Sequence, residues 1–304
     1  MPSPIRLILL DASIYIFQGW HVLPDSFRDA ADKPVNAVLG FGDTLARILL
    51  VQAPVYLACG FDTSLGKGVR QEIHSDYKAN RPEAPADLKY QFAVCRELAD
   101  AFGVQGFASD RYEADDILGT FARHAQQREE PFIVVTADKD LTQLLGRADW
   151  WWNCSRDDWL DYRGVERRFG ARPGQIPDLL ALAGDAVDNI PGVPGIGQTT
   201  AARLLRKWGN IDTLYDNLER VGDMKFRGAR RVQDLLEEHR DTVEISRQLT
   251  PVLIDHSLSP DIDRLRVRAP DPERLAALFE RLQLDPARES RWRRALKCDP
   301  VDQA

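Results

Sequence analysis

Residues 5–11 read IRLILLD, a nearly continuous apolar run that ends in an aspartate. The same pattern returns at residues 55–62 (VYLACGFD) and at residues 132–138 (FIVVTAD). Apolar runs without polar alternation are typical of strands that are buried on both faces of a parallel sheet. The three runs therefore predict an α/β fold, with a mostly parallel sheet flanked by helices.

Helical patterns lie between these runs, at residues 37–51, 85–102 and 113–127, where apolar side chains recur on one face. Strands that alternate with helices support the α/β assignment. The run Trp150–Trp152 fits a further buried strand better than a functional site.

After about residue 164 the pattern changes to short helical segments broken by Gly and Pro, as at Pro191-Gly192 and Pro194-Gly195. An amphipathic helix predicted over residues 272–284 should pack back on the body of the protein. We expect three regions: a core over 1–163 that includes an arch segment at about 64–90, a helical subdomain over 164–260, and a C-terminal segment over 261–304 that packs on the core.

The composition is that of a globular protein, with 304 residues, 44% hydrophobic residues and a formal net charge of -7. No apolar run approaches the length needed to cross a membrane, and no signal-peptide cleavage site follows the first apolar run. The four cysteines are scattered without a CxxC pair, which predicts reduced thiols and a cytoplasmic location. We expect a monomer.

Acidic residues gather where the predicted strands end. In an open α/β sheet this edge is where ligands bind, so the acids should face one crevice. The spacing of Asp138 and Asp140 would point both side chains the same way in an extended backbone. The candidate set comprises Asp11, Asp62, Glu113, Asp115, Asp116, Asp138, Asp140, Asp185 and Asp188.

Each of these acids, taken singly, also fits a helix cap or a turn. Nine converging carboxylates, however, would repel one another strongly without cations. Oxygen ligands with no nearby His or Cys select Mg²⁺ or Mn²⁺. Two such ions about 4 Å apart form a clamp for phosphoryl transfer.

Two basic segments are candidates for contact with DNA. Residues 69–83 carry Arg70, Tyr77, Lys78 and Arg81, which suits phosphate binding and base stacking, although a solvated loop is the better explanation of this segment taken alone. The glycine-rich turn over residues 192–197 is more specific.

This turn, GVPGIG, precedes a predicted helix over residues 198–208 that carries Arg203, Arg206 and Lys207 and no acid. Glycines let a phosphate approach the backbone, and the helix start offers free N–H groups. We therefore expect a clamp for DNA that does not depend on base sequence. The basic run at residues 225–231 is equally compatible with phosphate contact and with a solvated face.

These motifs together resemble the bacterial 5′-nuclease family, which includes the 5′–3′ exonuclease domain of DNA polymerase I, the phage flap endonucleases and their stand-alone relatives. The matching stretches are LILLDAS, CGFD, YKANRPE, YEADDILG, VVTADKDLTQLL and LAGDAVDNIPGVPGIGQTTAARLL. Phe17-Gln18 departs from the aromatic-Arg pair that is frequent in the family.

The resemblance implies a PIN-like nuclease core, a helical arch over the active site and a helix-hairpin-helix module. It implies a first metal held by Asp11, Asp62, Glu113, Asp115, Asp116 and Asp138, and a second held by Asp140, Asp185 and Asp188. Within the first set, Asp11, Asp62, Asp116 and Asp138 would be catalytic. Lys78 and Arg81 would steer the scissile phosphate.

The resemblance also implies that Gly192, Gly195, Gly197, Gln198, Thr199, Arg203 and Lys207 contact the DNA backbone, with a K⁺ ion at the turn. The implied activity is metal-dependent cleavage of DNA at 5′ ends, nicks or flaps in replication or repair, beside a DNA polymerase or ligase. The alternatives are a catalytically silent DNA-binding protein of the same fold, a ribonuclease with a PIN-type core and, least favoured, a two-aspartate phosphatase.

Overall fold

The computed structural model describes residues 5–63, 68–258 and 261–297. Within them, six strands form one sheet in the order β3-β2-β1-β4-β5-β6. All neighbouring pairs are parallel except β5 and β6, so the prediction of a mostly parallel sheet is confirmed. The strands are β1 (Leu7–Asp11), β2 (Tyr56–Gly60), β3 (Gln105–Phe107), β4 (Phe132–Val135), β5 (Trp150–Asn153) and β6 (Asp158–Asp161).

The sheet divides the apolar core into two layers, because successive side chains of a strand point to opposite faces. In β1, Leu7 and Leu9 belong to one buried cluster, whereas Ile8 and Leu10 belong to the other. All four are fully buried. This two-sided burial explains why the strand sequence is apolar without alternation.

Helices cover both faces of the sheet. The face of Ile8 and Leu10 shares its core with α1 (Ala12–Val22), α2 (Asn36–Gln52) and α4 (Ala86–Ala101). The other face packs against α5 (Ala114–Gln127).

The C-terminal helices α12 (Pro272–Arg281) and α13 (Pro286–Ala295) pack beside α2 and α4, as the sequence predicted. Trp292 anchors them: it is fully buried, and its Nε1 donates a hydrogen bond to Asp43 Oδ1 over 2.8 Å.

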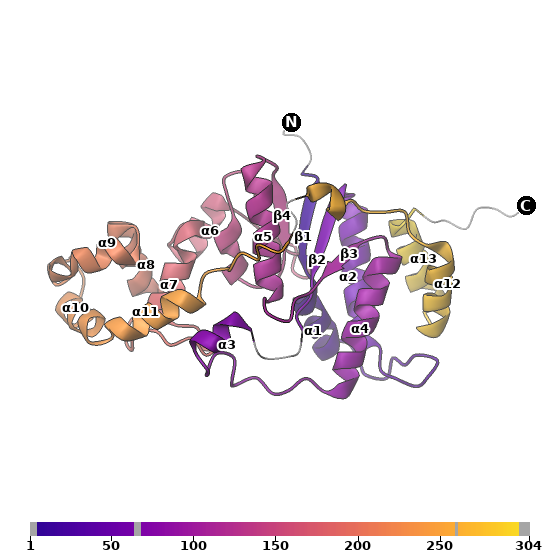
Figure 1. Cartoon of the computed structure of the whole chain (residues 1–304), viewed down its shortest axis with the longest axis horizontal. Coiled ribbons are helices and arrows are strands. Elements are labelled where there is room, and N and C mark those ends of the chain that lie inside the picture. The colour runs from indigo at the N-terminus through magenta and orange to yellow at the C-terminus, as the bar shows by residue number, and fades with distance from the viewer. Residues whose placement is uncertain (1–4, 64–67, 259–260, 298–304) are drawn as a thin grey trace, which may run out of the picture.

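A helical region extends to one side of the sheet (Figure 1). It contains short helices joined by tight turns, in agreement with the Gly and Pro breaks in the sequence. Its elements are η1 (Asp140–Leu144), α6 (Tyr162–Phe169), η2 (Pro173–Gln175), α7 (Ile176–Ala183), α8 (Gln198–Trp208), α9 (Ile211–Asp216), η3 (Leu218–Arg220), α10 (Ala229–Glu238) and α11 (Arg240–Leu249), and η4 (Ile262–Leu265) returns to the sheet.

The predicted arch is only partly helical. Residues 64–67 lie outside the described part of the chain, and α3 (Val69–Ile73) is the helical portion of the segment before α4. Residues 74–85 follow an irregular path of turns. Within the described part of the expected arch segment, residues 74–85 are thus not helical, and they offer few apolar side chains with which to pack an amphipathic helix.

Two strands were not predicted from the sequence. β3 and β6 are short, and each lies at an edge of the sheet, where burial imposes little apolar pattern. The Trp run does form strand β5; Trp151 and Trp152 are buried, while Trp150 stays 37% exposed. None of the described helices is long and apolar enough to cross a membrane.

Candidate active site and nucleic-acid surface

The carboxyl ends of β1, β2 and β4 bring acidic side chains to one edge of the sheet. β1 pairs in parallel with both β2 and β4, so the three strands end side by side. Asp11 is the last residue of β1, and Asp62 and Asp138 follow β2 and β4 within three residues. The predicted convergence of these strand ends is thus present.

Asp11 belongs to this acidic edge and also caps the N-terminus of α1. Its Oδ1 accepts the N–H of Ile14 at the start of α1, and its Oδ2 accepts the Thr136 hydroxyl over 2.8 Å. Burial, followed by repulsion from Asp62, raises the pKa of Asp11 to about 7. The sequence did not single out Thr136, although its position just before Asp138 in the TADKD motif was a usable signal.

Helix α5 brings a further acid to the same place. Asp62 Oδ1 accepts the N–H of Ala114 over 2.8 Å, which fixes the start of α5 against the end of β2. Asp115 follows directly on this helix. Burial, with repulsion from Asp11 and Asp138, raises the pKa of Asp115 well above its ordinary value.

Asp138 and Asp140 lie at a helix start rather than in an extended backbone, so the predicted conformation is corrected. Asp138 Oδ1 accepts the N–H of Asp140, where η1 begins. Burial raises the pKa of both carboxyls; that of Asp140 reaches about 8 because repulsion from Asp138 adds to burial. The Oδ1 atom of Asp140 is buried without a hydrogen-bond partner among the described residues.

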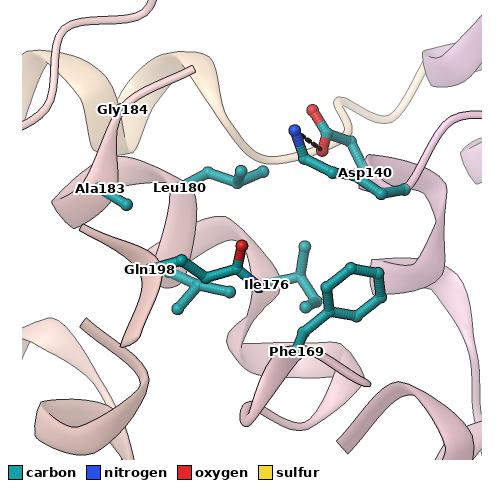
Figure 2. Close-up of a pocket in the computed structure, with 9 residues that line it drawn as sticks. Asp140, Phe169, Ile176, Leu180, Ala183, Gly184 and Gln198 are labelled. Atoms are coloured by element: carbon teal, nitrogen blue, oxygen red, sulfur yellow. Dashed lines mark ion pairs between the residues drawn. The ribbon is translucent and has the colours of Figure 1, made fainter. Parts of the chain in front are cut away.

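A cavity of about 170 Å³ lies beside Asp140 (Figure 2). Apolar side chains, including those of Phe169, Ile176 and Leu180, face it from α6 and α7. Gln198, the first residue of α8, forms another part of its wall. The cavity therefore separates an acid of the strand edge from the start of the basic helix.

Lys139 lies between two acids of the second predicted metal set. Its Nζ is 2.7 Å from Asp185 Oδ2 and 3.9 Å from Asp140 Oδ1. Burial alone would raise the pKa of Asp185, but the hydrogen bond and attraction from Lys139 outweigh it and lower that pKa. Sequence reasoning named the acids on either side of Lys139 and missed the lysine itself.

Lys78 occupies a similar position among the other acids. Its Nζ lies 2.6 Å from Glu113 Oε1 and 3.6 Å from Asp188 Oδ2. Arg81 also pairs with Asp188. Burial works against the charge on Lys78, yet the surrounding acids, with Glu113 foremost, hold its pKa well above the ordinary value.

Hydrogen bonds to backbone carbonyls dock the segment of Lys78 onto the loop that carries Asp185 and Asp188. The Lys78 N–H donates to the Asp188 carbonyl over 2.9 Å. Asn189 Nδ2 donates to the Asp76 carbonyl over 2.6 Å, and Asn80 Nδ2 to the Ala186 carbonyl over 3.1 Å. The structure thus joins two segments more than one hundred residues apart.

Arg70 does not lie on a DNA-facing surface, which corrects the prediction made for it. Its side chain is buried, and its guanidinium forms two 2.8 Å hydrogen bonds to Asp116. It also donates to the carbonyls of Leu249 and Pro251. Arg70 therefore ties α3 to α5 and to the end of α11.

The same contacts occupy Asp116, which was predicted to bind metal and to be catalytic. Besides Arg70, its two oxygens accept the N–H groups of Glu113 and Leu253. Adjacent helix residues point in different directions, so Asp115 and Asp116 cannot both face the strand edge. The structure assigns Asp116 to a buried structural ion pair.

Tyr77 is also turned inward and is unavailable for stacking on a base, so this prediction is corrected. It is 3% exposed, and its hydroxyl lies 2.9 Å from Glu113 Oε2 and 3.3 Å from Asp188 Oδ2. The pKa of Tyr77 is raised, mainly by burial, so the phenol remains a hydrogen-bond donor to these acids.

The carboxylate oxygens of the acidic edge are suitable ligands for divalent cations, although they are not arranged as a complete coordination shell. No group of three acid, His or Cys side chains in the described ranges is close enough to hold a metal ion. The lysines Lys78 and Lys139 neutralise several acids instead. The Asp140 Oδ1 atom nevertheless accepts no hydrogen bond among the described residues, and burial together with repulsion between neighbouring acids keeps the pKa values of Asp115 and Asp140 raised.

The glycine-rich turn packs closely against the end of α7. A Cβ on Gly192 would lie 2.2 Å from the Gly184 nitrogen, so this glycine is required by the fold itself. By contrast, a Cβ on Gly197 would meet nothing within 4 Å. Gly195 has a φ of 88°, a conformation that favours glycine.

Helix α8 begins directly after this turn, with the bounds predicted from the sequence. Gln198 and Thr199 open the helix and are exposed. Arg203 and Lys207 are exposed as well, and lie over the rings of Phe226 and Trp208. The expected basic surface on α8 is therefore accessible.

The fold is thus a resolvase-like α/β core joined to a helical region, and both parts match models of one family. Residues 6–170 match the N-terminal resolvase-like domain of 5′-3′ exonucleases. Residues 171–273 match the C-terminal SAM fold of 5′-3′ exonucleases. The chain belongs to the 5′-3′ exonuclease family.

Curated relatives agree with this assignment. The chain is 37% identical over 282 residues to DNA polymerase I of Pseudomonas aeruginosa, a match that covers 92% of this chain and 31% of the polymerase. It is 31% identical to a 5′-3′ exonuclease of Aquifex aeolicus, over 91% of this chain and 92% of that protein. The chain thus spans about a third of the polymerases that it matches.

Solved structures share the fold. The T5 D15 protein co-crystallised with metal ions superposes with a TM-score of 0.66 at 17% identity, covering 96% of this chain and 98% of the other. The catalytic core of Rad2 in complex with a DNA substrate superposes with a TM-score of 0.65 at 16% identity, covering 97% and 93%.

Proposed function

We propose that the protein is a metal-dependent nuclease that hydrolyses DNA phosphodiesters near 5′ ends, nicks or flap junctions. The observation that carries the proposal is the electrostatics of the strand edge. Burial raises the pKa values of Asp11, Asp115, Asp138 and Asp140, and repulsion from neighbouring acids adds to it. Such an edge is costly for a protein to keep unless it binds cations.

Two sets of acids would hold two Mg²⁺ or Mn²⁺ ions. Asp11, Asp62, Glu113, Asp115 and Asp138 form the first set. Asp140, Asp185 and Asp188 form the second. When bound, such ions activate water and stabilise the charge on the scissile phosphate and the leaving oxygen.

Lys78 and Arg81 would bind and orient the scissile phosphate. Both cations contact carboxylates in the described structure, with Lys78 between Glu113 and Asp188. A divalent cation at those acids would replace the ion pairs and leave both side chains available for phosphate oxygens. The docking of Lys78 on the Asp188 loop fixes its backbone near both acids during this exchange.

The turn after α7 and the start of α8 would hold the duplex. Gly195, Gly197, Gln198 and Thr199 offer backbone N–H groups at a helix N-terminus, which favours phosphate. Arg203 and Lys207 add positive charge along α8. Gly192 contributes to this site indirectly, because the absence of a side chain lets the turn pack against Gly184.

A K⁺ ion at this turn is also part of the proposal. Within the described residues, the carbonyl oxygens of Gly192, Pro194, Gly195 and Ile196 accept no hydrogen bond. Free carbonyl oxygens at a turn suit a weakly hydrated monovalent cation beside a phosphate.

The direct test is cleavage of a 5′-labelled flap duplex, compared with the matching single strand, in Mg²⁺ and in EDTA. The Asp11→Asn/Asp115→Asn variant removes two acids of the first set and should lose cutting by a factor of at least about one hundred. Asp234→Asn/Glu237→Gln is a matched control, because both residues are exposed and have no ion pair among the described residues.

Metal-dependent cutting near the junction that survives in the control but not in the acid variant would support the proposal. Tight binding to the flap without cutting in Mg²⁺ or Mn²⁺ would favour the silent DNA-binding protein instead. Cutting of RNA with no cutting of DNA would favour the ribonuclease. The similarity to polymerase I domains suggests that a DNA polymerase supplies the substrate by strand displacement, and a ligase would then seal the product.

A further inference from the structure

A second basic site lies away from the acidic strand edge. A cavity of about 470 Å³ opens between α6, η2 and α8, and four arginines converge on it. They are Arg147, Arg163, Arg172 and Arg206, and all four are exposed. Glu166 is the single acid in the lining.

These four arginines have no ion-pair partner among the described residues. Two other arginines of the helical region behave differently: Arg168 pairs with Asp158 and Arg247 pairs with Asp212. The chain has 47 acidic residues against 40 basic ones, so acids are available for pairing. Four guanidinium groups without an ion pair around one cavity repel one another and form a local excess of positive charge, although Arg172 Nε donates to Gln175 Oε1 and Arg147 lies over the Tyr162 ring.

The buried side chain of Gln175 gives the cavity a defined shape. Gln175 is 8% exposed; its Oε1 accepts the Arg172 N–H over 3.0 Å, and its Nε2 donates to the carbonyls of Leu205 and Gly209. Arg172 is thereby fixed beside the end of α8.

Gly170 completes this arrangement. It ends α6 with a φ of 73°, and a Cβ there would lie 3.1 Å from Ala202 Cβ and 3.7 Å from Arg206 Nη2. A larger residue at this position would therefore press on α8 and on the cavity wall.

The site is separate from the proposed active site. Arg147 precedes the amino end of β5, whereas the acids lie at the carboxyl ends of the parallel strands. Arg206 is near the end of α8, eight residues after Gln198. At 1.5 Å per residue, it lies about 12 Å along the helix from the glycine-rich turn.

We propose that this arginine cavity binds phosphate groups and that it extends the duplex-binding surface along α8, beyond the turn. The planar guanidinium group matches phosphate oxygens in two-pronged contacts, which a lysine cannot reproduce. The inference that these phosphates belong to a DNA backbone rests on the proposed function. The inference that the cavity binds phosphate is independent of it.

The test compares Arg147→Gln/Arg163→Gln with the native protein. Binding to a 5′-flap duplex is measured by anisotropy in Ca²⁺ over a range of salt concentrations, so the readout does not need cleavage. Loss of two phosphate contacts should weaken binding and should make the slope of log K against log salt shallower by about 1.8. A parallel titration with inorganic tripolyphosphate, followed by calorimetry, tests a free phosphate ligand.

Arg123→Gln/Arg294→Gln is the matched control, with the same change of charge at exposed arginines outside the cavity. A shallower slope in the cavity variant but not in the control supports a DNA backbone. Loss of tripolyphosphate binding with unchanged DNA binding supports a phosphate site for a free ligand. Equal DNA slopes together with no tripolyphosphate binding in the native protein would overturn the proposal. Failure of the nuclease proposal would appear separately, as absence of cleavage by the native protein.

Discussion

Arg70 and Asp116 form a two-pronged ion pair inside the protein, with Nη1 2.8 Å from Oδ2 and Nη2 2.8 Å from Oδ1. They are 46 residues apart, and the pair links α3 to α5. Arg70 also holds the end of α11 through two carbonyls. One guanidinium thus positions three segments around the acidic edge.

Arg70→Met should lower the free energy of unfolding by about 3–5 kcal/mol, because it leaves the buried Asp116 carboxylate without its counter-charge. Chemical denaturation measures this change. Arg111→Met is the control: Arg111 pairs with Glu72 at the surface over 3.5 Å, and its loss should cost at most about 1 kcal/mol. Equal effects of the two substitutions would contradict the structural role of Arg70.

Lys139→Met should tighten the binding of Mn²⁺. The ammonium group competes with a cation for Asp185 and lies near Asp140. Because Lys139 is half exposed, the gain should stay within about fivefold, the factor that corresponds to about 1 kcal/mol. Electron paramagnetic resonance of free Mn²⁺ measures the affinity without cleavage.

Lys33→Met serves as the comparison, since Lys33 lies near the Asp29 carboxylate outside the acidic edge. It should leave the Mn²⁺ affinity unchanged. Weaker Mn²⁺ binding in Lys139→Met would show that Lys139 supports the metal site instead of competing for it.

The stability of the metal-free protein should fall as pH rises from about 5 to about 8.5. The pKa of Asp11 is raised to about 7 and that of Asp140 to about 8, so the folded state holds protons that the unfolded state has already released. This stabilisation is fully present below the unfolded pKa and is lost as pH rises through the folded values. Mg²⁺ should restore stability most at the upper end of the interval, where the carboxyls are ionised.

Melting temperatures in EDTA and in Mg²⁺ across this pH range check the prediction. The Asp11→Asn/Asp140→Asn variant should show a smaller loss of stability with pH, because its amides do not titrate. A native pH slope in this variant would mean that other groups govern the effect.

Two glycines of the turn should respond differently to alanine. Gly192→Ala should destabilise the fold, since its Cβ would lie 2.2 Å from the Gly184 nitrogen. Gly197→Ala should leave the melting temperature nearly unchanged, because nothing lies within 4 Å of its Cβ and its φ is negative.

If a phosphate approaches the backbone at Gly197, Gly197→Ala should still weaken binding to duplex DNA. Thermal melting and DNA titration of the two variants separate a packing role from a ligand-facing role. Unchanged DNA binding in a folded Gly197→Ala variant would move the phosphate contact elsewhere on the turn.

The sequence by itself determined the central strands, the helices between them and the exposed basic helix α8. Local sequence patterns explain this success: β1 is apolar without alternation because both of its faces are buried, and α8 is bounded by Gly197 and Gly209. The sequence also indicated that acids would meet at the carboxyl ends of the strands, because parallel neighbours end at the same edge.

Only the tertiary structure decided which of the named side chains face that edge. The sequence pattern marks three residues as functional that are buried in the structure. Packing between distant segments turns Arg70, Tyr77 and Asp116 inward. The same folding places Lys139 between Asp140 and Asp185 and gathers four arginines from separate elements around one cavity. Sequence spacing reports neighbours along a helix or strand, whereas the burial and pairing of a charge depend on segments that meet only when the chain folds.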